Sequence, residues 1–107
     1  MLYGLCMKYQ LVLQFSASSD TDFQQMLALE ESLAVGLSDL ADVDGHDFGS
    51  GEMNIFLLTD HPTEAFAAAR SYITQPMALS MRAAYRILKR DRFTILWPPG
   101  LQHFGVR

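Results

Sequence analysis

The spacing of hydrophobic positions along the chain is first typical of a strand and then typical of a helix. Residues 8–15, "KYQLVLQF", carry an apolar side chain at every second position, and this period of two predicts a β-strand with one buried face. In residues 16–36 the apolar positions recur at helical spacing, after serine and aspartate residues that suit an N-cap. Gly36 suits the helix end, and Glu30 and Glu31 are expected at the border of the apolar face or in water.

Residues 41–60 predict two strands joined by a glycine-rich turn. Gly49, Ser50 and Gly51 supply the backbone freedom that a hairpin needs. The second segment, "MNIFLL", is apolar on both faces apart from Asn54, which suits a central strand.

The last third of the chain predicts a helix, a loop and a hairpin. Pro62 suits the first position of a helix over residues 60–73, whose expected buried stripe includes Tyr72. Residues 74–81 are expected to form a loop, because Pro76 cannot continue the helix. Residues 82–100 alternate again around the polar turn "KRDR" and predict a hairpin.

This order of elements predicts an α+β fold, a ferredoxin-like βαββαβ(β) sandwich with an antiparallel sheet and two helices on one face. The first and third strands should lie in the centre of the sheet, with the second strand and the final hairpin at opposite edges. We expect one domain over residues 1–107, with residues 1–6 as a disordered or extended N-terminal extension.

Composition and charge narrow the class of protein. Half of the 107 residues are hydrophobic, as in a globular domain, and a single cysteine, Cys6, cannot form an internal disulfide. With no apolar stretch long enough to cross a bilayer, we expect a cytoplasmic protein that does not bind membranes. Residues 1–69 hold every acidic residue except Asp91, whereas residues 70–107 are basic. Opposite charges at opposite edges would permit salt-sensitive head-to-tail association, and the overall acidity makes nucleic acid an unlikely partner.

A polar cluster around the predicted turn is the first candidate site. Its candidate binding residues are Asp44, His46, Ser50, Glu52 and Asn54. No recognised metal-ligand spacing is present, an acidic neighbourhood disfavours a phosphate cradle, and no cofactor is expected. Strand alternation would let Asp44 and His46 converge, so His46 could act as a general base with Asp44 or Glu52 orienting it. The alternative is a local network that fixes the turn, in which the buried amide of Asn54 finds partners on the open sheet face or at the neighbouring turn.

The sheet face opposite the helices is the second candidate. Its candidate interface residues are Gln10, Val12, Gln14, Phe56, Leu58 and Arg86. This face is too apolar to be left wholly in water. Either the final hairpin or tail, with Leu96 and Phe104, folds over it, or it forms a dimer interface or a shallow ligand cleft.

Two segments, "DGHDFGSGEMNIFLLTDHP" and "YRILKRDRFTILWPPG", resemble a family of small single-domain bacterial proteins of unassigned function that carry a DGHDxGSGEMNIF-like motif. The resemblance covers most of the chain from Met7 and implies the same order of elements, but no activity. We therefore expect a small cytoplasmic bacterial protein, a non-catalytic binding or protein-interaction module that acts as a homodimer. The alternatives are a small enzyme with acid–base chemistry at the His46/Glu52 hairpin, and a regulatory or toxin-neutralising protein.

Overall fold

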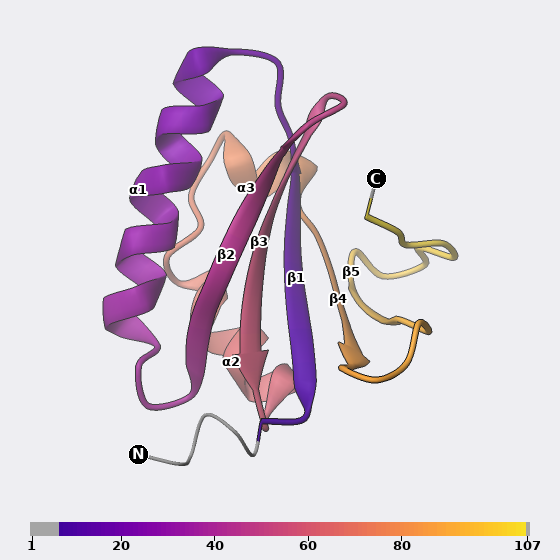
Figure 1. Cartoon of the computed structure of the whole chain (residues 1–107). Helices are drawn as coiled ribbons and strands as arrows, with labels where there is room; N and C mark the ends of the chain where they lie inside the picture. Colours follow the sequence, from indigo (N-terminus) through magenta and orange to yellow (C-terminus); the bar gives the residue numbers. More distant parts are fainter. Residues whose placement is uncertain (1–6, 107) are drawn as a thin grey trace.

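The computed structural model describes residues 7–106, so the expected extension at residues 1–6 lies outside the described residues. The elements are β1 (Tyr9–Ser16), α1 (Asp20–Gly36), β2 (Ala41–Gly49), β3 (Glu52–Thr59), α2 (Pro62–Arg70), α3 (Met77–Ser80), β4 (Arg82–Ile87) and β5 (Thr94–Trp97). Five strands form one sheet in the order β2-β3-β1-β4-β5, and every neighbouring pair is antiparallel. The predicted α+β class is confirmed, as are the interior positions of the first and third strands (Figure 1).

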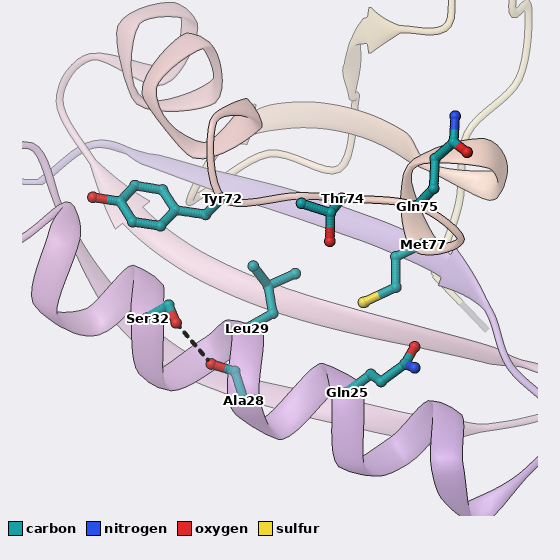
Figure 2. Close-up of a pocket in the computed structure, with 8 residues that line it drawn as sticks. All are labelled: Gln25, Ala28, Leu29, Ser32, Tyr72, Thr74, Gln75 and Met77. Atoms are coloured by element: carbon teal, nitrogen blue, oxygen red, sulfur yellow. Dashed lines mark hydrogen bonds between the residues drawn. The ribbon is translucent and has the colours of Figure 1, made fainter.

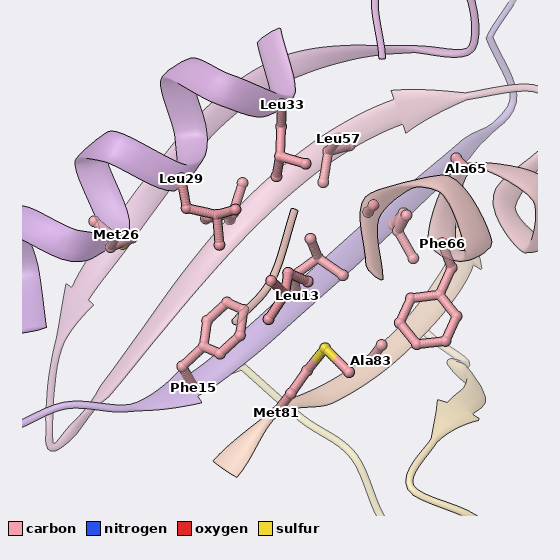
Figure 3. Packing of buried hydrophobic residues seen from close by; sticks show 14 of the residues in the cluster. Leu13, Phe15, Met26, Leu29, Leu33, Leu57, Ala65, Phe66, Met81 and Ala83 are labelled. Atoms are coloured by element: carbon pink, nitrogen blue, oxygen red, sulfur yellow. The ribbon is translucent and has the colours of Figure 1, made fainter. Parts of the chain in front are cut away.

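One hydrophobic core lies between the sheet and the helices. Alternate residues of β1 and β3 point into it, among them Leu13, Phe15 and Leu57, and meet Met26 and Leu33 of α1 (Figure 3). These five side chains are at most 1% exposed. Full burial of one such side chain contributes about 1.5–3 kcal/mol, so this face fixes which side of the sheet the helices cover.

Helix α1 begins at the cap that its sequence predicts. The Oγ atom of Ser19 accepts a hydrogen bond from the backbone N–H of Asp22, and the carboxylate of Asp22 in turn accepts one from the N–H of Ser18. Ser19 thereby satisfies a backbone donor that the first helical turn leaves without a partner, and Asp22 binds the N–H of the residue before the cap.

Residues 74–81 differ from the predicted loop, because they contain the short helix α3. Helix α2 already ends at Arg70, and Pro76 is the N-cap of α3, a position where the missing N–H donor costs no helical hydrogen bond. Met77, Ala78 and Met81 then pack against the core, so three helices rather than two cover this face. Tyr72, which we expected in the buried stripe, is 40% exposed.

The two hairpins are confirmed and differ in how they are held. Between β2 and β3, Ser50 and Gly51 both have positive φ angles, 55° and 79°, as a tight two-residue turn requires. The short edge strand β5 is tied to the helix layer by the guanidinium of Arg70, which lies 4.1 Å from the ring centroid of Trp97. None of the helices in the described part of the chain is long and apolar enough to span a membrane.

Candidate functional site

A β-bulge in β2 decides where the side chains of the polar cluster point. Val43 pairs with Leu57 and Gly45 pairs with Phe56, so Asp44 is an extra residue with no partner on β3. Gly45 adopts a φ of 147°, which side chains disfavour, and this explains the glycine within a strand. The extra residue shifts the alternation by one position, so that Val43 and His46 both face the helices.

His46 therefore lies beside α1 rather than beside the turn. It pairs with Ile55, and its Nδ1 atom lies 2.8 Å from the Oε1 atom of Glu30. The rings of Phe23 and Phe48 complete this contact, with edge-to-face packing of Phe23 on both His46 and Phe48. The bulge interrupts the alternation that was expected to bring Asp44 and His46 together, and the contact of His46 is with Glu30 instead.

Glu52 and Asn54 lie on the opposite face of the sheet from His46. The Nε2 atom of Gln14 lies 3.2 Å from Glu52 Oε2, 3.0 Å from Asn54 Oδ1 and 2.9 Å from the carbonyl oxygen of Gly105. The Asn54 amide also donates to Glu52 over 3.3 Å. Asn54 thus finds partners on the open face, as its burial required.

The cluster consequently divides into two structural units. His46 and Glu52 point to opposite faces, so neither can orient the other, and Ser50 lies in the turn between the strands. Within residues 7–106, no group of three or more histidine, cysteine, aspartate or glutamate side chains lies close enough to hold a metal ion. The geometry gives the proposed acid–base arrangement at this hairpin no support.

The open face is covered in part by the C-terminal tail. Val12 is fully buried and Gln14 is 5% exposed, and the hydrogen bond from Gln14 to Gly105 places the tail over this half of the sheet. Phe104 of the tail packs on Phe93, with ring centroids 5.0 Å apart. Two of the predicted interface residues are therefore buried within the chain itself.

The remaining interface candidates stay within reach of solvent. Gln10, Phe56, Leu58 and Arg86 are each half-buried. Arg86 also has an internal role, because its Nε atom donates to Gln10 Oε1 over 2.8 Å and its Nη1 atom donates to two carbonyl oxygens of the following turn.

A groove between α1 and the segment before α3 is a feature that the sequence pattern did not reveal. One cavity of about 300 Å³ lies there (Figure 2). Its lining is made of amides, hydroxyls and apolar side chains: Gln25, Ala28, Leu29, Ser32, Tyr72, Thr74, Gln75 and Met77. It continues along α1 to Gly36, where a side chain would collide with the Tyr72 ring.

Two more hollows flank the β4–β5 turn. One, of about 380 Å³, lies on the open face beside Phe56 and Val106, and the other, of about 450 Å³, lies beside Tyr9 and Tyr85. Arg86 and Asp91 border both hollows. The basic turn thus stands between two recesses, which the strand pattern alone could not show.

Comparisons with protein-family models, curated proteins and solved structures found no match to this chain. The resemblance to a family of small bacterial proteins is not tested by these comparisons and stays a prediction.

Proposed function

We propose that the chain is a non-catalytic interaction protein that acts as a homodimer through the uncovered part of its open sheet face. The observation that carries this proposal is the opposite charge of the two sides of the sheet. The edge strand β2 presents exposed Asp42 and Asp44 and half-buried Asp47, whereas the β4–β5 turn presents Lys89, Arg90 and Arg92. Such a distribution favours a partner with the same distribution reversed.

A second copy of the chain offers that reversed distribution. A two-fold axis that lies on the open face and runs parallel to the strands places the β2 side of one copy over the β5 side of the other. The aspartates of each copy then face the arginines and lysine of its partner, and both contacts are equivalent by symmetry. Both contacts would weaken at high salt, because exposed charge pairs are screened.

The apolar contribution to this interface comes from β3. Phe56 and Leu58 are half-buried on the open face, beside the part that the tail covers. Val106 of the tail is 38% exposed and lines the same hollow as Phe56. The apolar contact surface that we propose therefore consists of Phe56, Leu58 and Val106. Val106 of the tail replaces Val12 and Gln14, which were predicted as interface residues but are buried.

Light scattering after size-exclusion chromatography tests the proposal at about 50 mM and about 500 mM NaCl. We expect a dimer at low salt, and we expect its dissociation constant to rise when the salt concentration is raised. Leu58→Glu should weaken the dimer at least about tenfold, since it places a charge in the apolar contact. Val35→Glu is the matched control, because Val35 is 76% exposed on α1, in the helix layer. A monomer at both salt concentrations, or equal effects of the two variants, would refute the interface.

We also assign the fold to the ferredoxin-like type, with β5 as an added edge strand. The succession β1-α1-β2-β3-α2-β4 and the order β2-β3-β1-β4 within the sheet support this assignment. A cytoplasmic location is proposed with it, and its support is the single cysteine of the sequence.

A further inference from the structure

The hollow beside the end of β4 combines an apolar wall with a basic rim. Tyr9, Tyr85 and Ile87 line it from β1 and β4, and Thr94 lines it from β5. The rings of Tyr9 and Tyr85 meet edge to face, with centroids 5.5 Å apart. Its volume of about 450 Å³ is within the range of small-molecule sites.

The turn that forms the rim is held in place before any ligand arrives. The N–H of Leu88 donates to the carbonyl of Lys8 over 2.9 Å, and the N–H of Arg90 donates to the carbonyl of Ile87 over 2.8 Å. Arg86 donates from Nη1 to the carbonyls of both Leu88 and Arg90. A preorganised rim reduces the ordering cost of binding.

The charge of the rim exceeds what the chain itself neutralises. Arg86, Arg90 and Arg92 line the hollow together with one acidic residue, Asp91, which leaves an excess of two positive charges. Arg90 and Arg92 are exposed, and the close contacts between basic side chains and carboxylates within residues 7–106 are those of His46 with Glu30 and His61 with Glu64. The guanidinium groups of Arg90 and Arg92 therefore have no carboxylate partner in the described chain.

We propose that this hollow binds a small organic phosphate monoester that carries a planar ring. A phosphate monoester is dianionic near neutral pH, which matches the excess charge, and guanidinium groups bind phosphate with paired hydrogen bonds. The ring lies against Tyr85 and Ile87, and the hydroxyl of Thr94 is a further donor. This inference goes beyond the proposed dimer, with which it shares Arg90 and Arg92, because the apolar wall of the hollow at Tyr9 and Tyr85 faces the helix layer whereas Phe56 and Leu58 face the open side.

Titration of the ¹⁵N-labelled full chain with AMP, adenosine and inorganic phosphate, followed by amide shifts, tests the proposal. We expect AMP to shift residues 85–94 with a Kd below about 1 mM, and adenosine and phosphate each to bind at least about tenfold more weakly. No shifts with AMP at several millimolar, or equal affinity for AMP and inorganic phosphate, would overturn the proposed ligand class.

Charge-removing variants locate the site. Arg90→Gln and Arg92→Gln should each weaken AMP binding about tenfold or more. Arg82→Gln is the control, since Arg82 is exposed on β4 but neither lines the hollow nor belongs to the proposed dimer contact, and it should change the Kd less than about twofold. Equal losses in all three variants would mean general attraction to a basic surface and would refute the site.

The dimer and the ligand site are separated by repeating the titration with Leu58→Glu. We expect this variant to lose the dimer and to bind AMP at least as tightly as the unchanged chain, because Arg90 and Arg92 are then released from the partner's aspartates. Loss of AMP binding in a folded Leu58→Glu monomer would overturn the ligand site as proposed and would leave the dimer untouched.

Discussion

The imidazole of His46 and the carboxylate of Glu30 are joined over 2.8 Å, from the edge strand β2 to the outer helix α1. The contact is partly shielded, because the side chains are 34% and 17% exposed. It connects two elements that the sequence places side by side without indicating which residues meet. The pair adds a polar link between α1 and β2 to the apolar packing of the helix on the sheet.

Replacing Glu30 by alanine should therefore destabilise the fold by about 0.5–1.5 kcal/mol, the usual contribution of one such hydrogen bond. Glu31→Ala is the control, because Glu31 is exposed on the same helix and gains the same helix propensity. Urea unfolding followed by circular dichroism measures both. Equal midpoints for the two variants would show that the His46 contact does not contribute.

The bulge in β2 makes a second prediction. Gly45→Ala should cost about 1–3 kcal/mol, because alanine must adopt a φ of 147° although its methyl group meets no atom within 4 Å. Gly49→Ala meets open space too and has no positive φ, so its effect should stay within about 0.5 kcal/mol. Thermal unfolding of the two variants separates the effect of backbone strain from that of packing. A similar loss of stability in both variants would argue against strain at the bulge.

The tail depends on Gln14. Gln14→Leu removes the donor that Asn54 Oδ1 and the carbonyl of Gly105 share, so the free energy of unfolding should fall by about 1–3 kcal/mol. Cleavage by chymotrypsin after Phe104 should also accelerate, because the tail loses its anchor on β1. Gln24→Leu, at an exposed position of α1, is the control for the change in polarity and should leave both measurements nearly unchanged.

Acid stability should depend on Asp22. The hydrogen bond from the Ser18 N–H, assisted by Ser19, lowers the pKa of the Asp22 carboxyl below its ordinary value of 3.8. The folded chain therefore binds this proton more weakly than the unfolded chain does, and the stabilisation present above pH 3.8 is lost as pH falls through the folded pKa.

A ¹³C NMR titration of the Asp22 carboxyl should give a midpoint below 3.8. Asp22→Asn should make the acid limb of the stability curve shallower. A midpoint at or above 3.8 would contradict the cap geometry seen at the start of α1.

The elements themselves could be predicted because their signals are local. A period of two over residues 8–15, a helical period over residues 16–36 and a glycine turn at 49–51 each depend on neighbours in the chain. The segment around Pro76 was mispredicted for the same reason. A proline forbids the continuation of a helix locally, but whether the residues after it form a new turn depended on the core that receives Met77 and Met81.

The sequence by itself determined the strands, the long helices, the central place of β1 and β3, and the separation of acidic and basic residues. Hydrophobic periodicity and charge are properties of neighbouring residues, so they can be recognised without the tertiary structure. Only the tertiary structure decided which polar groups meet. One extra residue at Asp44 turned His46 to Glu30, the tail covered Val12 and Gln14, and the β4–β5 turn bordered an open basic hollow. The glycine at position 45, inside a predicted strand, was the one local sign of the bulge. The register and the long-range contacts could not be predicted, because they depend on how distant segments pair.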